Sequence, residues 1–318
     1  MSDTLIQTIG LKKYFDINEK ATLHAVDDVN LSITKGTTLG VVGESGCGKT
    51  TLGRTVLGLI PATEGQVLYE GKDITHPSKS EYAQLRQEMQ IIFQDPYSSI
   101  NPRHSIKKTI AEPLLVNKIV REKKERLEKV LELMETVGLA ERLADSYPHE
   151  LDGGRRQRVG IARALAVNPK FIVCDEPVSA LDVSIQAQVL NLLMDLQDRM
   201  GLTYMFITHD LSVVRHISTE IAVMYLGQCI ERAPSKELFM HPLHPYTKAL
   251  IMSIPVPDAS ARSRKTEIIK GELTSPINPK PGCRFAGRCP YAIPRCTDAD
   301  IPLKEVAPNH YVACILHE

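Results

Sequence analysis

The sequence predicts an α/β fold with a parallel sheet covered on both faces, organised around a phosphate-binding loop. Three short apolar runs, residues 38–42, 171–174 and 203–208, alternate with stretches of helical periodicity. Apolar strands that alternate with helices are typical of a parallel sheet buried between helical layers. A glycine-rich segment, residues 43–51, lies between the first run and the helix expected over 51–59.

That glycine-rich segment matches the phosphate-loop pattern G-x-x-x-x-G-K-[ST]. Glycines let backbone N–H groups curl around a phosphate more closely than a Cβ would allow. The lysine supplies a point charge for the β- and γ-phosphates, and the threonine hydroxyl can ligate Mg²⁺. A chance glycine-rich turn is the alternative, but the flanking strand and helix favour a nucleoside triphosphate site. Its residues are Gly43, Glu44, Ser45, Gly46, Cys47, Gly48, Lys49, Thr50 and Thr51.

Composition limits the class of protein. The 318 residues carry a formal net charge of zero and a hydrophobic fraction of 43%, which supports a sizeable core without a basic field for nucleic acid. No apolar run of about 18 residues predicts a transmembrane helix, and the acidic start predicts no secretory signal. Seven cysteines, an odd number, speak against a disulfide framework and favour the reducing cytoplasm.

The chain divides into an expected nucleotide-binding domain over 1–253 and a C-terminal part over 254–318. Residues 1–36 predict short strands at 5–11, 22–26 and 29–33 in an antiparallel sheet. Residues 97–165 predict an inserted helical subdomain; within it, the alternating charges of helix 121–137 favour a solvated face over nucleic-acid binding. Prolines from residue 255 onward predict a linker, followed by a cysteine-bearing module.

Two further segments carry nucleotide chemistry. Asp175 and Glu176 follow an apolar strand, where one carboxylate can hold Mg²⁺ through its water shell and the next can polarise an attacking water. Upstream, Gly153 and Gly154 precede a basic helix, an arrangement typical of a second anion site. A glycine N-cap alone is the simpler interpretation, but it does not explain two phosphate-type sites in one chain.

These motifs together resemble the nucleotide-binding subunit of ABC transporters, over about residues 5–250. The resemblance is carried by residues 43–51, Gln94, residues 151–158, Asp175, Glu176, residues 179–182 and His209. Within that superfamily the chain resembles the oligopeptide/dipeptide importer ATPases, F-type member, through residues 11–15, 92–99, 176–184 and 244–250. The resemblance implies a P-loop NTPase core of RecA-like type, an N-terminal antiparallel β subdomain, an inserted α-helical subdomain and a small cysteine-rich C-terminal extension.

The resemblance also implies a role for each matching residue. Phe15, rather than Tyr14, would stack on adenine. Gln94 would sense Mg²⁺ and the attacking water, Glu176 would be the base, and His209 would contact the γ-phosphate. Magnesium would be held by Thr50, Gln94 and Asp175. The segment Asp152, Gly153 and Gly154 would close the partner's ATP site, with Ser179 and Asp182 at the dimer interface.

One position departs from the family pattern. Asp152 stands where the family has a serine that donates a hydrogen bond to the γ-phosphate. An ionised aspartate cannot donate and adds repulsion, although Arg155 could partly neutralise it. We therefore expect the ATP site completed by Asp152 to be impaired, whereas the site on this chain's own phosphate loop stays competent.

Four cysteines lie close together in the C-terminal module. Cys283, Cys289, Cys296 and Cys314 could hold a four-iron four-sulfur cluster or a tetrahedral Zn²⁺ ion, or remain free thiols. The spacing lacks C-x2-C knuckles, which favours the cluster, and the tail of the peptide-importer ATPases implies the same occupant. His310 and His317 are possible zinc ligands, but we expect both at the surface. Cys47 and Cys174 are expected to be small buried residues.

The resemblance implies ATP and Mg²⁺ as ligands and a peripheral location on the cytoplasmic face of the membrane. Its implied partners are a second, D-type ATPase, two transmembrane permease subunits and an extracytoplasmic peptide-binding protein, with no nucleic acid. Two alternatives remain: import of another solute such as nickel, and a soluble ABC-type ATPase acting on ribosomes, nucleic acid or iron–sulfur assembly.

Overall fold

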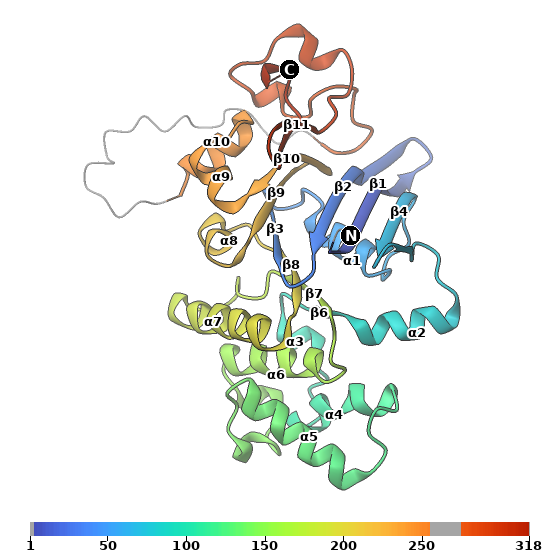
Figure 1. Ribbon diagram of the computed structural model, residues 1–318, viewed down its shortest axis with the longest axis vertical. Helices are drawn as coiled ribbons and strands as arrows, with labels where there is room; N and C mark the ends of the chain where they lie inside the picture. Colours follow the sequence, from blue (N-terminus) through green and yellow to red (C-terminus); the bar gives the residue numbers. More distant parts are fainter. Residues whose placement is uncertain (1–2, 255–274, 318) are drawn as a thin grey trace, which may run out of the picture. The chain divides into compact units, whose positions relative to one another are not determined.

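The computed structural model describes residues 3–254 and 275–317 (Figure 1). The predicted linker falls mostly on residues 255–274, outside the described residues. The chain forms two compact units. Unit 1 comprises Met1–Thr34, Thr38–His76 and Thr208–Glu318, and unit 2 comprises Lys35–Thr37 and Pro77–Ile207. Within the described residues, no helix is both long enough and apolar enough to cross a membrane.

Unit 1 contains the predicted antiparallel sheet, with strands in the order β2-β1-β4-β5. The strands are β1 (Thr4–Asn18), β2 (Ala21–Thr34), β4 (Glu64–Tyr69) and β5 (Lys72–Asp73). The two strands expected at 22–26 and 29–33 are one continuous strand, β2. Asp28 has a left-handed φ of 52° and the pairing with β1 shifts register on both sides of Val29, so Asp27-Asp28 makes a bulge rather than a turn.

A second sheet of unit 1 carries the phosphate loop. In it β3 (Thr38–Val42) runs parallel to β9 (Glu220–Tyr225), and β10 (Gln228–Pro234) pairs antiparallel with β9. The sheet is therefore mixed rather than purely parallel. The other side of β10 pairs with β12 (His310–Val312), which pairs with β11 (Lys304–Ala307). The cysteine module, which we call the extension (residues 275–317), thus adds strands to this sheet.

Among the helices of unit 1, α8 (Leu211–Ile217), α9 (Ser235–Met240) and α10 (Pro245–Met252) lie along the second sheet (Figure 1). Helix α1 (Lys49–Val56) contacts β1 and β2 of the first sheet, and the extension contains the one-turn helices Ala286–Arg288, Pro294–Thr297 and Ile315–His317. A core cluster joins α8, β9, β10, α9 and α10, and it includes Phe285 of the extension, which is 1% exposed. The extension therefore shares its hydrophobic core with the phosphate-loop sheet.

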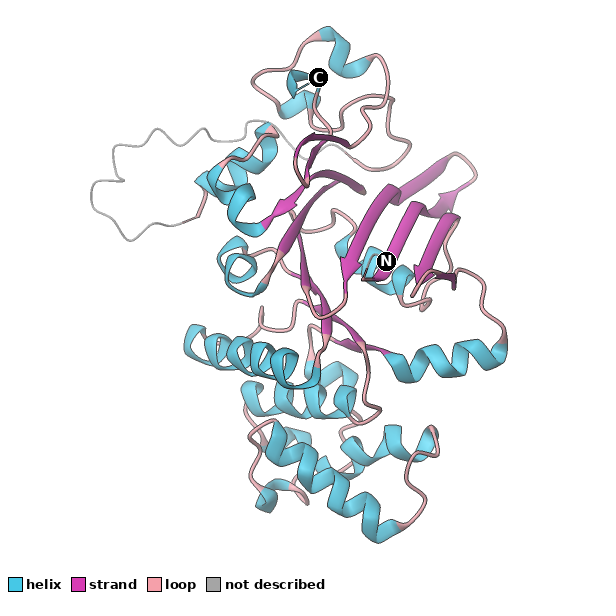
Figure 2. Ribbon diagram, viewed as in Figure 1, coloured by secondary structure: helices cyan, strands magenta, loops and turns pink. Residues whose placement is uncertain are grey.

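Unit 2 holds three strands that pair in parallel, as predicted, and the structure gives their order as β8-β7-β6. These are β6 (Met89–Ile92), β7 (Phe171–Asp175) and β8 (Thr203–Ile207). Between β6 and β7 the structure describes helices only (Figure 2). The helices of unit 2 are α2 (Lys79–Glu88), α3 (Pro96–Ser99), α4 (Ile106–Val116), α5 (Lys123–Thr136), the one-turn helices Glu141–Leu143 and Pro148–Glu150, α6 (Gly153–Leu165) and α7 (Val183–Met200).

A buried carboxylate, Glu231 on β10, ties the extension to the rest of unit 1. It is 0% exposed and accepts the backbone N–H of Leu243 (2.7 Å) and of His244 (2.8 Å). His310 of β12 donates Nε2–H to the same carboxylate at 2.8 Å. The expectation that His310 lies at the surface is wrong, because it is 1% exposed and satisfies this buried charge. His317 is half-buried, and its Nε2 lies 3.1 Å from the Leu243 carbonyl oxygen.

Glu231→Gln should lower the free energy of unfolding by about 2–4 kcal/mol, because an amide cannot accept three hydrogen bonds as an ionised carboxylate does. Glu64→Gln is the matched control. The Glu64 side chain of β4 is 60% exposed and pairs with Lys12, so we expect a change within about 0.5 kcal/mol. Urea unfolding measures both variants, and equal losses would contradict the role of Glu231.

Candidate functional site

The phosphate loop connects β3 to α1, as predicted, and two of its glycines are required by close backbone contacts. A Cβ on Gly48 would lie 1.9 Å from the Ala25 carbonyl oxygen of β2, and one on Gly43 would lie 2.2 Å from the Met224 carbonyl oxygen of β9. Gly48 also has a φ of 102° and is the N-cap of α1. Only glycine lets the loop pass between β2 and β9 with its N–H groups at a helix N-terminus.

Lys49 holds the two ends of the loop together. Its Nζ donates to the carbonyl oxygens of Gly43 (2.8 Å) and Glu44 (3.0 Å) and lies 3.8 Å from the Cys47 sulfur. The side chain is 5% exposed, so its charge lies in a largely desolvated loop, where it acts strongly on an anion. Cys47 and Cys174 are buried at 3% and 0% exposed, which confirms that expectation, and burial raises the pKa of the Cys47 thiol.

The two aromatic residues of β1 have different surroundings. Tyr14 stacks on His24 at 3.9 Å between ring centroids and donates its hydroxyl to Asp27. Phe15 is 36% exposed, with the Lys13 ammonium 4.8 Å from its ring centroid. Phe15 pairs with Leu23, two residues from the Ala25 carbonyl that contacts Gly48. Phe15 thus presents an exposed ring on the strand pair that supports the phosphate loop.

His209 follows β8 and belongs to unit 1, where it lies near the start of the loop. The backbone N–H of the preceding residue, Thr208, donates to the Val41 carbonyl oxygen at 3.1 Å. Val41 is one residue from the end of β3, so His209 lies at the edge where β3 enters the phosphate loop. This position is compatible with the γ-phosphate contact expected of it.

The catalytic pair expected from the sequence is brought together in unit 2. Asp175 ends β7 and is 2% exposed. Glu176 has a left-handed φ of 47°, and its N–H donates to the Ile207 carbonyl oxygen at 2.9 Å. Gln94 donates Nε2–H to Glu176 Oε2 at 3.1 Å. The amide of Gln94 therefore orients the carboxylate expected to polarise water.

The segment Asp152–Gly154 begins α6. Asp152 is the N-cap, accepting the Arg155 N–H on Oδ1 at 2.7 Å, and Arg155 Nε lies 3.4 Å from Oδ2. The glycines are the first residues of the helix rather than a turn before it. A Cβ on Gly154 would lie 2.5 Å from Ile185 of α7, so close packing is a second reason for glycine here.

The residues expected at a dimer interface lie close to Glu176 and to the glycine pair. Ser179 donates Oγ–H to the Glu176 carbonyl oxygen at 3.1 Å, and Asp182 is the exposed N-cap position of α7. Leu181 lies between them, 3.1 Å from the place a Cβ on Gly153 would occupy. Glu176, the Ser179–Asp182 turn and the glycine pair are therefore one connected surface of unit 2.

The four C-terminal cysteines line one small cavity of ≈ 10 Å³. Burial raises the pKa of Cys283 to about 11, and it also raises the pKa values of Cys289 and Cys314. Among the residues that the structure describes, no three side chains of His, Cys, Asp or Glu converge closely enough to hold a single metal ion. The fold therefore gathers the four thiols without arranging them as a tight tetrahedral site.

Sequence reasoning missed the contacts of α10 and of the extension with the phosphate loop. Tyr246, 0% exposed, accepts the backbone N–H of Glu44 on its hydroxyl at 3.0 Å. Arg288 pairs with the Glu44 carboxylate at 3.1 Å. One signal in the sequence was the stretch 244–250, which was used for the family resemblance and not for the loop.

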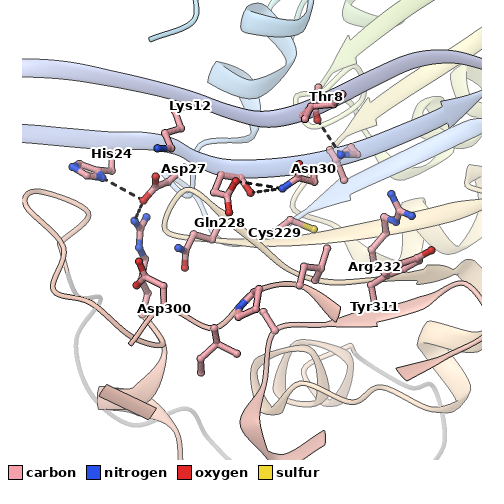
Figure 3. Close-up of a pocket in the computed structure, with 18 of the residues that line it drawn as sticks. Thr8, Lys12, His24, Asp27, Asn30, Gln228, Cys229, Arg232, Asp300 and Tyr311 are labelled. Atoms are coloured by element: carbon pink, nitrogen blue, oxygen red, sulfur yellow. Dashed lines mark hydrogen bonds and ion pairs between the residues drawn. The ribbon is translucent and has the colours of Figure 1, made fainter. Parts of the chain in front are cut away.

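A cavity of ≈ 1080 Å³ lies in unit 1 between the β1–β2 hairpin, β10 and the extension (Figure 3). None of the phosphate-loop residues lines it, so it is distinct from the nucleotide site. Its charged groups are largely paired with one another: Asp27 contacts His24 at 3.3 Å and also Arg284, whereas Arg232 pairs with Glu220 at 3.0 Å. Cys229, which the sequence did not place, is buried in β10 on this cavity.

Comparison with known proteins agrees with these features. The family model described as ABC transporter matches residues 26–179, and the one described as Oligopeptide/dipeptide transporter, C-terminal region, matches residues 230–296. The oligopeptide transport ATP-binding protein AppF of Bacillus subtilis is 50% identical over 323 residues, covering 99% of this chain and 98% of that protein. OppF of Salmonella typhimurium is 49% identical over 320 residues, covering 98% and 96%.

Solved structures place the fold in the same group. The ATP-binding cassette MJ0796, in a dimeric post-hydrolysis state bound to ADP and Pi, is 29% identical with a TM-score of 0.66, covering 73% of this chain and 99% of that chain. CbiO1 of Clostridium perfringens, part of an ABC transporter complex, is 26% identical with a TM-score of 0.67, covering 75% and 92%. The chain therefore belongs to the ABC transporter family, among the ATP-hydrolysing ATP-binding proteins of the oligopeptide/dipeptide transporters.

Proposed function

We propose that this chain hydrolyses ATP to drive the import of di- and oligopeptides through separate membrane subunits. The observation that carries the proposal is the likeness to oligopeptide transport ATP-binding proteins over nearly the whole chain, extension included. The proposed partners are a second, D-type ATPase, two permease subunits and an extracytoplasmic peptide-binding protein. The chain would act at the cytoplasmic face of the membrane.

In the proposed mechanism, unit 1 binds the nucleotide. Phe15 stacks on the adenine, and Lys49 attracts the β- and γ-phosphates from a largely desolvated position. The N–H groups of the loop and of the α1 N-terminus donate hydrogen bonds to the phosphate oxygens. Thr50 takes part in binding the Mg²⁺ that accompanies ATP, and His209 contacts the γ-phosphate.

Unit 2 supplies the groups for hydrolysis. Glu176 polarises the attacking water, and the 3.1 Å hydrogen bond from Gln94 keeps its carboxylate oriented. Asp175, at the end of β7, would help to hold the Mg²⁺ that accompanies ATP. A second ATPase chain completes each site, because the Asp152–Gly154 segment serves the partner's ATP and Ser179 and Asp182 lie at the interface.

We further propose that Cys283, Cys289, Cys296 and Cys314 hold a four-iron four-sulfur cluster. The support is that the four thiols line one cavity and that their spacing in the sequence lacks C-x2-C knuckles. The cluster would supply a covalent crosslink between the segments of the extension.

Glu176→Gln should lower ATP turnover of the assembled transporter by roughly a hundredfold or more and abolish peptide uptake, because the amide cannot act as a base. ATP binding should stay within about threefold. Peptide uptake into proteoliposomes and filter binding of ATP measure the two effects. The control is Glu128→Gln, at an exposed position of α5. ATP turnover and uptake that do not respond to any peptide would overturn the peptide assignment.

Asp152→Ser should raise ATP turnover of the assembled transporter severalfold, because serine can donate to the γ-phosphate and removes a negative charge. Serine is as good an N-cap as aspartate, so α6 and the melting temperature should change little. Asp152→Gly removes the charge without supplying a hydrogen-bond donor and keeps most of the cap, which separates the two effects. Unchanged turnover in both variants would contradict an impaired site.

Cys289→Ser should reduce the iron content of anaerobically purified protein and its broad visible absorption, since it removes one proposed ligand. Cys229→Ser is the control, because Cys229 is buried in β10 and does not line the cysteine cavity. If the protein contains stoichiometric zinc and no iron, the four cysteines form a zinc site and the cluster proposal is contradicted. If the purified protein contains neither metal, and its melting temperature does not change after metal reconstitution, the thiols are unliganded and the cluster proposal is contradicted.

A further inference from the structure

The segment of the extension between Cys283 and Cys289 carries an arginine that reaches into the phosphate loop. Arg288 Nη1 lies 3.1 Å from Glu44 Oε2, and Nη2 lies 3.3 Å from Oε1. The contact is therefore two-pronged, with two N–H groups on two carboxylate oxygens. The side chains are only 10% and 24% exposed, so solvent screens the pair incompletely.

Both members of this pair are held in place by their surroundings. Arg288 also donates Nη1–H to the Tyr225 hydroxyl at 3.2 Å. Tyr225, Tyr246 and Phe285 pack edge to face, with ring centroids 4.7–5.4 Å apart. Tyr246 in turn accepts the backbone N–H of Glu44 at 3.0 Å. Arg288 therefore reaches Glu44 from a rigid aromatic platform, and Glu44 is held at both its backbone and its side chain.

The charge of Glu44 needs such a partner. Glu44 is the second residue of a loop that binds a multiply charged anion, and an unpaired carboxylate there would repel the phosphates. We propose that Arg288 is a positioning residue for the triphosphate, which neutralises Glu44 and so makes the extension part of the nucleotide site. Arg288 acts through Glu44, and the inference depends on ATP binding by this family but not on peptide import or on the cluster.

The first test compares ligands of different charge. Arg288→Gln should weaken ATP binding roughly tenfold and ADP binding less, because repulsion by the unpaired carboxylate grows with the charge of the ligand. Isothermal titration of the full chain with ATP and with ADP measures both. The matched control is Arg295→Gln, another arginine of the extension, which lies between Cys289 and Cys296 and should change either affinity less than twofold.

The second test distinguishes neutralisation from support of the fold. In the Arg288→Gln background, Glu44→Gln should recover most of the lost ATP affinity, because it removes the unpaired carboxylate. Arg288→Lys keeps the charge but loses the two-pronged contact, so its loss of ATP affinity should be smaller than that of Arg288→Gln. If Glu44→Gln recovers no affinity in that background, or if ATP and ADP lose equally, the proposal is overturned. Should Arg288→Gln fail to fold, titration of Arg288→Lys with ATP and with ADP decides it by the same comparison.

Discussion

The close approach of the phosphate loop to three backbone segments is the constraint on which unit 1 depends. Gly48 lies against the Ala25 carbonyl, Gly43 lies against the Met224 carbonyl, and Gly227 donates its N–H to the Cys47 carbonyl oxygen at 2.9 Å. The loop is thus enclosed by β2, by β9 and by the turn after β9. A backbone enclosed in this way keeps its N–H groups oriented without a ligand, which lowers the cost of ordering them when phosphate binds.

The parts of the site that sequence could predict are those with a local cause. The phosphate loop, the Asp175-Glu176 pair and the strands that carry them follow from spacing and apolar runs within a few residues. The bulge at Asp28, which merges two expected strands, depends on pairing with β1. The burial of His310 depends on Glu231, 79 residues earlier in the chain. Such long-range pairs leave no periodic trace, so an isolated histidine near the C-terminus is interpreted as exposed.

The glycine pair at the start of α6 has a packing requirement that the predicted anion site does not explain. That site would use the N–H groups of the helix N-terminus, but a Cβ on Gly154 would also lie 2.5 Å from Ile185 of α7, and one on Gly153 would lie 3.1 Å from Leu181. Ser179, in the same turn as Leu181, bonds to the Glu176 carbonyl. Within unit 2, contacts therefore run from the glycine pair to the residue proposed to polarise water.

The extension is bound to the phosphate-loop sheet by three chemically different contacts. Glu231 and His310 form a buried hydrogen-bonded pair, Phe285 fills the hydrophobic core, and Arg284 contacts both Asp27 and the Leu226 carbonyl beside the loop-binding turn. Each contact would leave a buried charge or a cavity in unit 1 if the extension came away. Since Arg284, Phe285 and Arg288 all lie between Cys283 and Cys289, the geometry of these two cysteines also sets the positions of the three side chains that reach the nucleotide-binding part of the chain.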